Sequence, residues 1–185
     1  MARRTLLQRR ALASNLALAL VIAGLAPHRP AHSAAARAAD SVGVNRYMWF
    51  SPSTKTVHVA LEASVGGNNG GMNFNGSAKG AATMIVPSGW KVRMHFTNLD
   101  AIPHSAIIIT EQDPLPAFPE TPAFAGAYTR DLTGGLATSQ TDDVTFTAAP
   151  AGKYILVCGV PGHGPSGMWV RFEVAGNASA PSYSM

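Results

Sequence analysis

The 185 residues are enough for one domain with a core of its own, and frequent glycine (18) and proline (13) favour a turn-rich β architecture over a helical one. The formal charge of +4 would suggest a nucleic-acid partner, but residues 1–39 hold six arginines and no acid. The rest of the chain carries eight basic and ten acidic residues, a net charge of −2, which excludes nucleic acid as the expected partner.

Residues 1–39 have the pattern of a secretory signal. Four arginines precede an apolar run over residues 11–26, and Ala36-Arg37-Ala38 offers a cleavage site. This run is shorter than the ~20 residues of a membrane span. We therefore expect an exported protein at the periplasmic or extracytoplasmic face of the membrane. An uncleaved anchor, with membrane association, stays open as the alternative, and Arg9-Arg10 leaves a twin-arginine route open.

Short segments of alternating or continuous apolar residues follow in residues 40–175. They predict strands over 56–62, 83–86, 90–97, 105–110, 143–147, 153–158 and 168–174. Residues 66–80 are rich in Gly and Asn and predict a loop in which Met72 and Phe74 plug the core. The prolines and glycines of residues 111–140 predict a long ordered loop. The small and polar residues 176–185 predict a disordered tail. This number of strands indicates an all-β, Greek-key β-sandwich domain over residues 40–175.

One segment between two predicted strands carries three metal-binding residue types. It runs from Cys158 through His163 to Met168, with the spacing C-x4-H-x4-M, and glycine and proline dominate the residues between. Such a loop can fold its side chains back onto one point. A fourth ligand must come from elsewhere, and His104 stands at the start of the 105–110 strand. His58 and His95 instead fall on the polar face of their strands and are expected at the surface.

The donor types select the metal. One thiolate, two imidazoles and one thioether form the set of a type 1 copper site, with a His₂Cys plane and a long axial Met. Structural zinc sites prefer two or more thiolates or four strong donors, and methionine is a poor zinc ligand. With a single cysteine in the chain, a binuclear centre bridged by two thiolates is excluded. We expect one copper ion, cycling between Cu(I) and Cu(II), bound by His104, Cys158, His163 and Met168.

The run from Val157 to Trp169 resembles the copper loop of the sulfocyanin family, and rusticyanin has a similar loop spacing. The segments Met72 to Gly76 and Ile102 to Ser105 also fit that family. The resemblance implies a cupredoxin fold and a high-potential one-electron carrier of respiratory chains, with cytochromes or a terminal oxidase as partners. Sulfocyanins are often membrane-anchored, whereas the present N-terminus looks cleavable.

Electron transfer without catalysis is therefore the expected function, with the outer ring edge of His163 as the electron port and Val160, Pro161 and Pro165 as an apolar docking rim. A periplasmic copper-binding or storage protein is the alternative, and it would need open Met- and His-rich clusters. An enzyme such as a copper nitrite reductase would need further His motifs and a second domain. Met48, Met72, Met84 and Met94 are expected to pack in the core.

The surroundings of the thiolate can also be predicted. Backbone N–H donors usually moderate the basicity of a metal-bound thiolate. Because Ser105 directly follows His104, its N–H should point at the Cys158 sulfur, with the nitrogen within about 3.3–3.8 Å of it. The Ser105 hydroxyl should tie together the two segments that carry the ligands.

Overall fold

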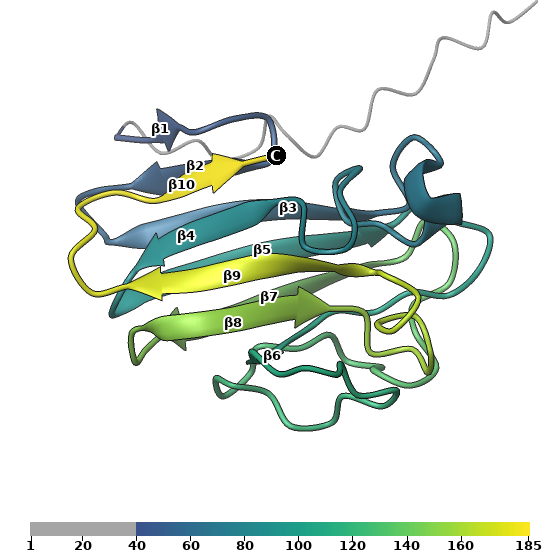
Figure 1. The fold of residues 1–185 in the computed structure, drawn as a ribbon. Helices are drawn as coiled ribbons and strands as arrows, with labels where there is room; N and C mark the ends of the chain where they lie inside the picture. The colour runs from purple at the N-terminus through teal and green to yellow at the C-terminus, as the bar shows by residue number, and fades with distance from the viewer. Residues whose placement is uncertain (1–39) are drawn as a thin grey trace, which may run out of the picture. The chain divides into compact units, whose positions relative to one another are not determined.

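The computed structural model describes residues 40–185, which contain ten strands and one short 3-10 helix joined by loops (Figure 1). The predicted signal, residues 1–39, lies outside the described residues. The elements are β1 (Val42–Gly43), β2 (Met48–Ser51), β3 (Thr56–Ala63), η2 (Asn68–Gly71), β4 (Thr83–Pro87), β5 (Trp90–Asn98), β6 (Ile107–Thr110), β7 (Thr141–Ala148), β8 (Gly152–Val157), β9 (Trp169–Ala175) and β10 (Ser182–Ser184).

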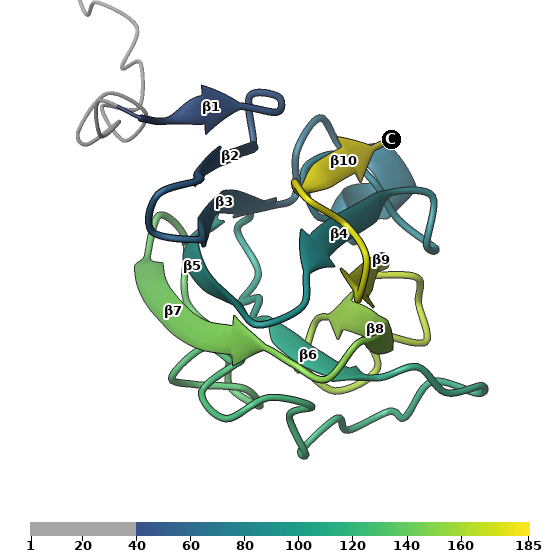
Figure 2. The ribbon, with the colours of Figure 1, turned by 90° about the vertical axis from the view of Figure 1, so that its left-hand side faces the viewer.

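The strands form two five-stranded sheets that face each other, as the view along the strands shows (Figure 2). One sheet has the order β1-β2-β3-β5-β7 and the other β10-β4-β9-β8-β6. The pairs β3·β5 and β4·β9 are parallel, and the remaining neighbours are antiparallel. This is the predicted all-β sandwich, and the parallel pairs reflect chain crossings between the sheets. No helix within residues 40–185 is long and apolar enough to cross a bilayer.

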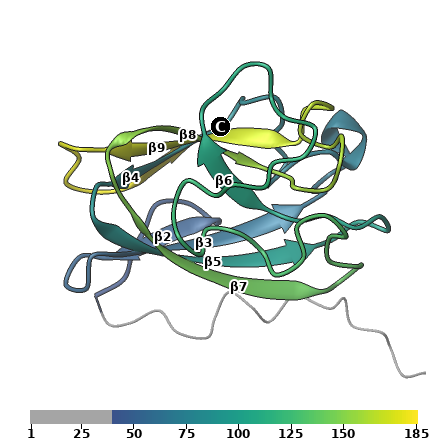
Figure 3. The same cartoon turned by 90° about the horizontal axis from the view of Figure 1, so that it is seen from below.

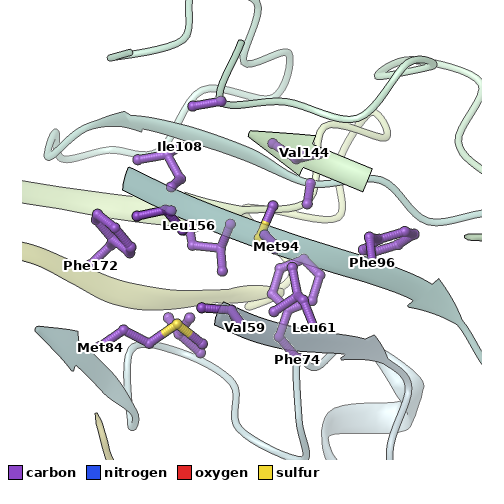
Figure 4. Close-up of a cluster of buried hydrophobic side chains, with 14 of the residues drawn as sticks. Val59, Leu61, Phe74, Met84, Met94, Phe96, Ile108, Val144, Leu156 and Phe172 are labelled. Carbon is purple, nitrogen blue, oxygen red and sulfur yellow. The ribbon is translucent and has the colours of Figure 1, made fainter. Parts of the chain in front are cut away.

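Alternating side chains build the core between the sheets (Figure 4). In β5, Val92, Met94 and Phe96 are buried while Lys91 and Arg93 are exposed, as the period of two predicts. Phe74 is fully buried and fills the core from the loop between β3 and β4, which confirms its predicted role, and Met72 is partly buried and packs against the same core cluster.

The structure differs from the sequence-based expectation at two strands, β10 and β2. The expected disordered tail from residue 176 is wrong, because β10 pairs with β4 through Ser182–Ser184 and Tyr183 packs against the core. Strand β2 was not expected, since its run Met-Trp-Phe-Ser lacks an alternating pattern; Met48 and Phe50 nevertheless face the core. β10 depends on pairing with β4, which is distant in the sequence, and β2 depends on pairing with its neighbours β1 and β3. Neither strand is marked by an alternating pattern of apolar residues.

The long segment between β6 and β7 is an ordered loop, as predicted. It winds past β6 at the underside of the sandwich (Figure 3). Phe124 enters the core from it, and Leu115 and Leu132 cover a second apolar cluster formed by Ile107, Ile109, Ile155 and Val157 on β6 and β8. This explains why β6 reads as continuously apolar: its two faces are both covered.

Candidate metal centre

Four loops meet at one end of the sandwich, on the right in Figure 1. They are residues 64–80 after β3, residues 99–106 after β5, the 111–140 segment, and residues 158–168 between β8 and β9, which we name the ligand loop. Backbone hydrogen bonds connect them: Leu136 and His104 exchange two bonds, and the Lys79 N–H donates to the Gly167 carbonyl at 2.8 Å. This end therefore has a rigid frame made by sequence-distant segments.

The ligand loop closes on itself. The Cys158 N–H donates to the Met168 carbonyl at 3.1 Å, and the Met168 N–H donates to the His163 carbonyl at 3.0 Å. Gly162 and Gly167 adopt positive φ angles of 80° and 104°, which allow these tight turns. The result places Cys158 and Met168 side by side at the ends of β8 and β9, both fully buried, with His163 partly exposed.

The side chains of His104, Cys158 and His163 converge, as predicted, with one ligand atom of each within 4.8 Å of the others. The Cys158 sulfur lies 3.5 Å from Nδ1 of His163 and 3.9 Å from Nδ1 of His104. Within residues 40–185 this is the one group of His, Cys, Asp or Glu side chains arranged to hold a metal ion. His104 is fully buried and lies next to His163, with ring centroids 5.0 Å apart.

These separations fit a metal ion held in a trigonal plane. Metal–nitrogen and metal–sulfur bonds of about 2.0 and 2.3 Å, at an angle of about 120°, place the two donors ~3.7–3.8 Å apart. The sulfur–nitrogen distances of 3.5 and 3.9 Å lie on either side of this value. The donor types and their spacing thus match a type 1 copper site, in which one thiolate and two imidazoles share the plane.

Burial sets the protonation of these groups. Desolvation raises the pKa of the Cys158 thiol, although N–H donors from Ser105 and Val160 and the Ser105 hydroxyl oppose the rise. Desolvation lowers the pKa of His104, against the effect of Asp100, and lowers that of His163 together with repulsion from His104. Near neutral pH the metal-free site therefore holds neutral imidazoles, which are ready to coordinate, and a thiol that must lose its proton.

The predicted contact to the thiolate is confirmed. The Ser105 nitrogen lies 3.4 Å from the Cys158 sulfur. The Ser105 hydroxyl accepts a bond from the Gly159 N–H at 3.0 Å and donates to the Leu132 carbonyl at 2.7 Å. It thus ties the segment that carries His104 to the ligand loop and to the long loop.

Sequence reasoning missed several residues that hold the site. Asp100 accepts a bond from the His104 ring at 3.2 Å, and buried Asn98 donates to the carbonyls of Ile102 and Leu136. Asn69 donates to the Ser166 carbonyl at 3.0 Å. An Asn-Leu-Asp turn just before Ile-Pro-His was the available signal for the first two. The contact of Asn69 spans 97 residues and has no local signal.

Two further histidines and three core methionines lie within residues 40–185, at or near the places that the sequence predicts. His58 is partly buried and stacks on Trp49 at 5.4 Å, and His95 lies 2.7 Å from Asp143. Met48, Met84 and Met94 are buried in the core, as predicted, and so form no open metal-loading cluster.

Comparison with known proteins gives consistent matches. The family model of the Sulfocyanin (SoxE) domain matches residues 44–185. A curated protein, sulfocyanin of Sulfolobus acidocaldarius, is 30% identical over 139 residues, which cover 71% of this chain and 70% of that protein. Among solved structures, a rusticyanin variant has 26% identity and a TM-score of 0.51, covering 65% of this chain and 78% of its own. Auracyanin A, described as a blue copper protein of Chloroflexus aurantiacus, has 22% identity and a TM-score of 0.48, over 65% of this chain and 99% of its own.

Proposed function

The chain belongs to the sulfocyanin family of blue copper proteins, and we propose that it is an exported carrier that passes single electrons between redox proteins. The family consists of electron-carrying cupredoxins and not of enzymes, so no substrate is transformed. The observation that supports the proposal most strongly is the convergence of His104, Cys158 and His163 at separations that suit one copper ion.

Four residues would hold the metal. The thiolate of Cys158 and the Nδ1 atoms of His104 and His163 would coordinate it. Met168, fully buried directly before β9, would supply the fourth donor, its thioether sulfur. When bound, copper supplies the one-electron couple between Cu(I) and Cu(II).

The protein's contribution is to keep the ligand positions unchanged in both oxidation states. The bond between the Cys158 N–H and the Met168 carbonyl fixes the ends of the ligand loop, and Ser105 fixes the thiolate from the other side. A frame that does not reorganise keeps the barrier to electron transfer low. Because the side chains of His104, Cys158 and Met168 are dry, the shell favours the less charged Cu(I) state and raises the potential.

Electrons would enter and leave through His163, the ligand that reaches the surface. Val160 and Pro161 are partly exposed and Pro165 is exposed, so the ligand loop presents an apolar rim around this ring. Apolar contact with little charge suits brief encounters with redox proteins such as cytochromes or a terminal oxidase.

Stopped-flow mixing with haem proteins tests the carrier role. The copper-loaded protein should accept and return one electron repeatedly, and Pro165→Glu should slow the exchange about tenfold by placing a charge in the rim. Val42→Glu is the matched control, because Val42 is 45% exposed on β1, away from the loops that carry the ligands. Equal rates for the two variants would contradict docking at the rim, and copper that cannot be cycled would contradict the carrier role.

Export is tested by cell fractionation and intact-mass measurement. A chain found outside the cytoplasm that begins near residue 39 supports a cleaved signal. A full-length chain in the membrane fraction would instead show that the N-terminal segment remains as an anchor, and full-length chain in the cytoplasm would contradict export.

A further inference from the structure

We propose that Asp100 is a positioning residue of the metal centre, which holds the His104 imidazole in one tautomer and whose negative charge lowers the reduction potential. The proposal rests on the proposed copper function. It concerns the contact between the Asp100 carboxylate and Nε2 of His104, which lie 3.2 Å apart. Nε2 is the ring nitrogen of His104 that faces away from the Cys158 sulfur.

The contact determines which ring nitrogen of His104 carries the proton. An ionised carboxylate can only accept a hydrogen bond, and Oδ2 of Asp100 faces Nε2 of His104, so Nε2 carries the hydrogen. Nδ1 then keeps its lone pair, and this is the nitrogen that faces the Cys158 sulfur at 3.9 Å.

Asp100 is itself held firmly. Its Oδ1 accepts the Ala101 N–H at 2.7 Å, and its own N–H donates to Oδ1 of Asn98 at 2.9 Å. Gly71, from η2, packs directly against Oδ2: a Cβ at this position would lie 2.7 Å from that oxygen. Gly71 also has a φ of +90°, where a residue with a side chain would be strained. The carboxylate is thus enclosed by two loops and cannot swing away from the ring at little cost.

The charge has a defined effect on the copper couple. A thiolate and two neutral imidazoles leave a Cu(II) site with one positive charge and a Cu(I) site with none. An anion hydrogen-bonded to a ligand makes that ligand a stronger donor and favours the more positive state. Asp100 therefore favours Cu(II), whereas the buried apolar surroundings of the ligands favour Cu(I). Its charge lowers the reduction potential below the value that burial alone would produce.

Two measurements test this. Nitrogen-detected NMR of the metal-free wild-type protein should show His104 protonated at Nε2, and this needs no copper. Asp100→Asn keeps a hydrogen-bond acceptor of the same shape and removes the charge. Against a fixed redox buffer, the ratio of Cu(I) to Cu(II) should rise about threefold to tenfold in this variant.

The control is Asp131→Asn, which removes the same charge from the long loop. The Asp131 carboxylate accepts a hydrogen bond from the Gly134 N–H and not from one of the metal-binding side chains. It should leave the Cu(I) to Cu(II) ratio nearly unchanged. His104 protonated at Nδ1 in the metal-free protein, an unchanged or lowered ratio for Asp100→Asn, or equal shifts for both variants would overturn the proposal. A wild-type protein that binds no copper as a blue site would instead overturn the proposed function, while the NMR result would still decide the tautomer.

Discussion

At the scale of single residues, the axial position is tested by Met168→Leu. Leucine fills a similar volume without the thioether, so the copper should stay bound. The thioether is a weak donor that stabilises Cu(II) more than Cu(I), and its loss should raise the potential in voltammetry. Met84→Leu, a buried core substitution in β4, is the control and should leave the potential unchanged. A clear fall in potential for Met168→Leu would contradict Met168 as the axial ligand.

The sequence predicts the converging side chains of the metal centre better than the residues that support them. The spacing of Cys158 and His163 and the position of His104 before a strand were sufficient to predict that these three side chains converge, because Gly/Pro loops between strands bring their ends together. Ser105 followed from its place beside His104. Asp100 could not be predicted in the same way, since its contact to His104 depends on how the turn after Asn98 folds.

At the scale of elements, strands with a period of two were predictable and strands defined by their partners were not. The predicted strands within residues 56–97 and 143–174 lie within about two residues of β3, β4, β5, β7, β8 and β9. β10 consists of Ser-Tyr-Ser, which has little intrinsic strand preference, and it forms because β4 offers a free edge and Tyr183 packs inward. Such a contact between distant segments leaves no periodic signal.

The loop over residues 64–80 should act as a clamp on the ligand loop. A Cβ added at Gly167 would lie 2.7 Å from Cγ of Lys79 and 3.0 Å from Nδ2 of Asn69, at a φ of +104°. Gly162 also has a positive φ, of +80°, but no atom lies within 4 Å of its Cβ position. Gly162→Ala therefore measures the backbone cost alone, about 1–2 kcal/mol.

We expect Gly167→Ala to reduce the free energy of unfolding of the metal-free protein by more than Gly162→Ala does, in urea titrations of both variants. The additional loss should be about 1–3 kcal/mol, because the clamp residues must move to admit a methyl group. Equal losses would show that the two loops do not constrain each other.

At the scale of the whole molecule, three histidines that are partly or fully buried make the metal-free protein sensitive to acid. Burial lowers the pKa of His58, with a further contribution from Arg93, and burial also lowers the pKa of His104 and His163. The unfolded chain binds protons at these groups below about pH 6.5, whereas the folded chain resists them. The free energy of unfolding should therefore fall as the pH drops from about 6.5, and stay level above it.

Denaturant titrations of the metal-free protein between about pH 5 and 8 measure this dependence. His58→Gln should make the decline shallower, because one of the contributing groups is removed from the pH range without touching the metal centre. Stability that rises on acidification over this range would show that the histidines gain protons more readily in the folded state.

The visible absorption spectrum of the copper-loaded protein tests the central claim, a type 1 copper site at Cys158, most directly. A Cu(II)–thiolate bond in this geometry gives an intense charge-transfer band at about 600 nm. We predict this band in the wild-type protein and its loss in Cys158→Ser, with far-ultraviolet circular dichroism showing the same β-sandwich in both. A wild-type protein that binds Cu(II) without the band, or a Cys158→Ser variant that stays blue, would contradict the account.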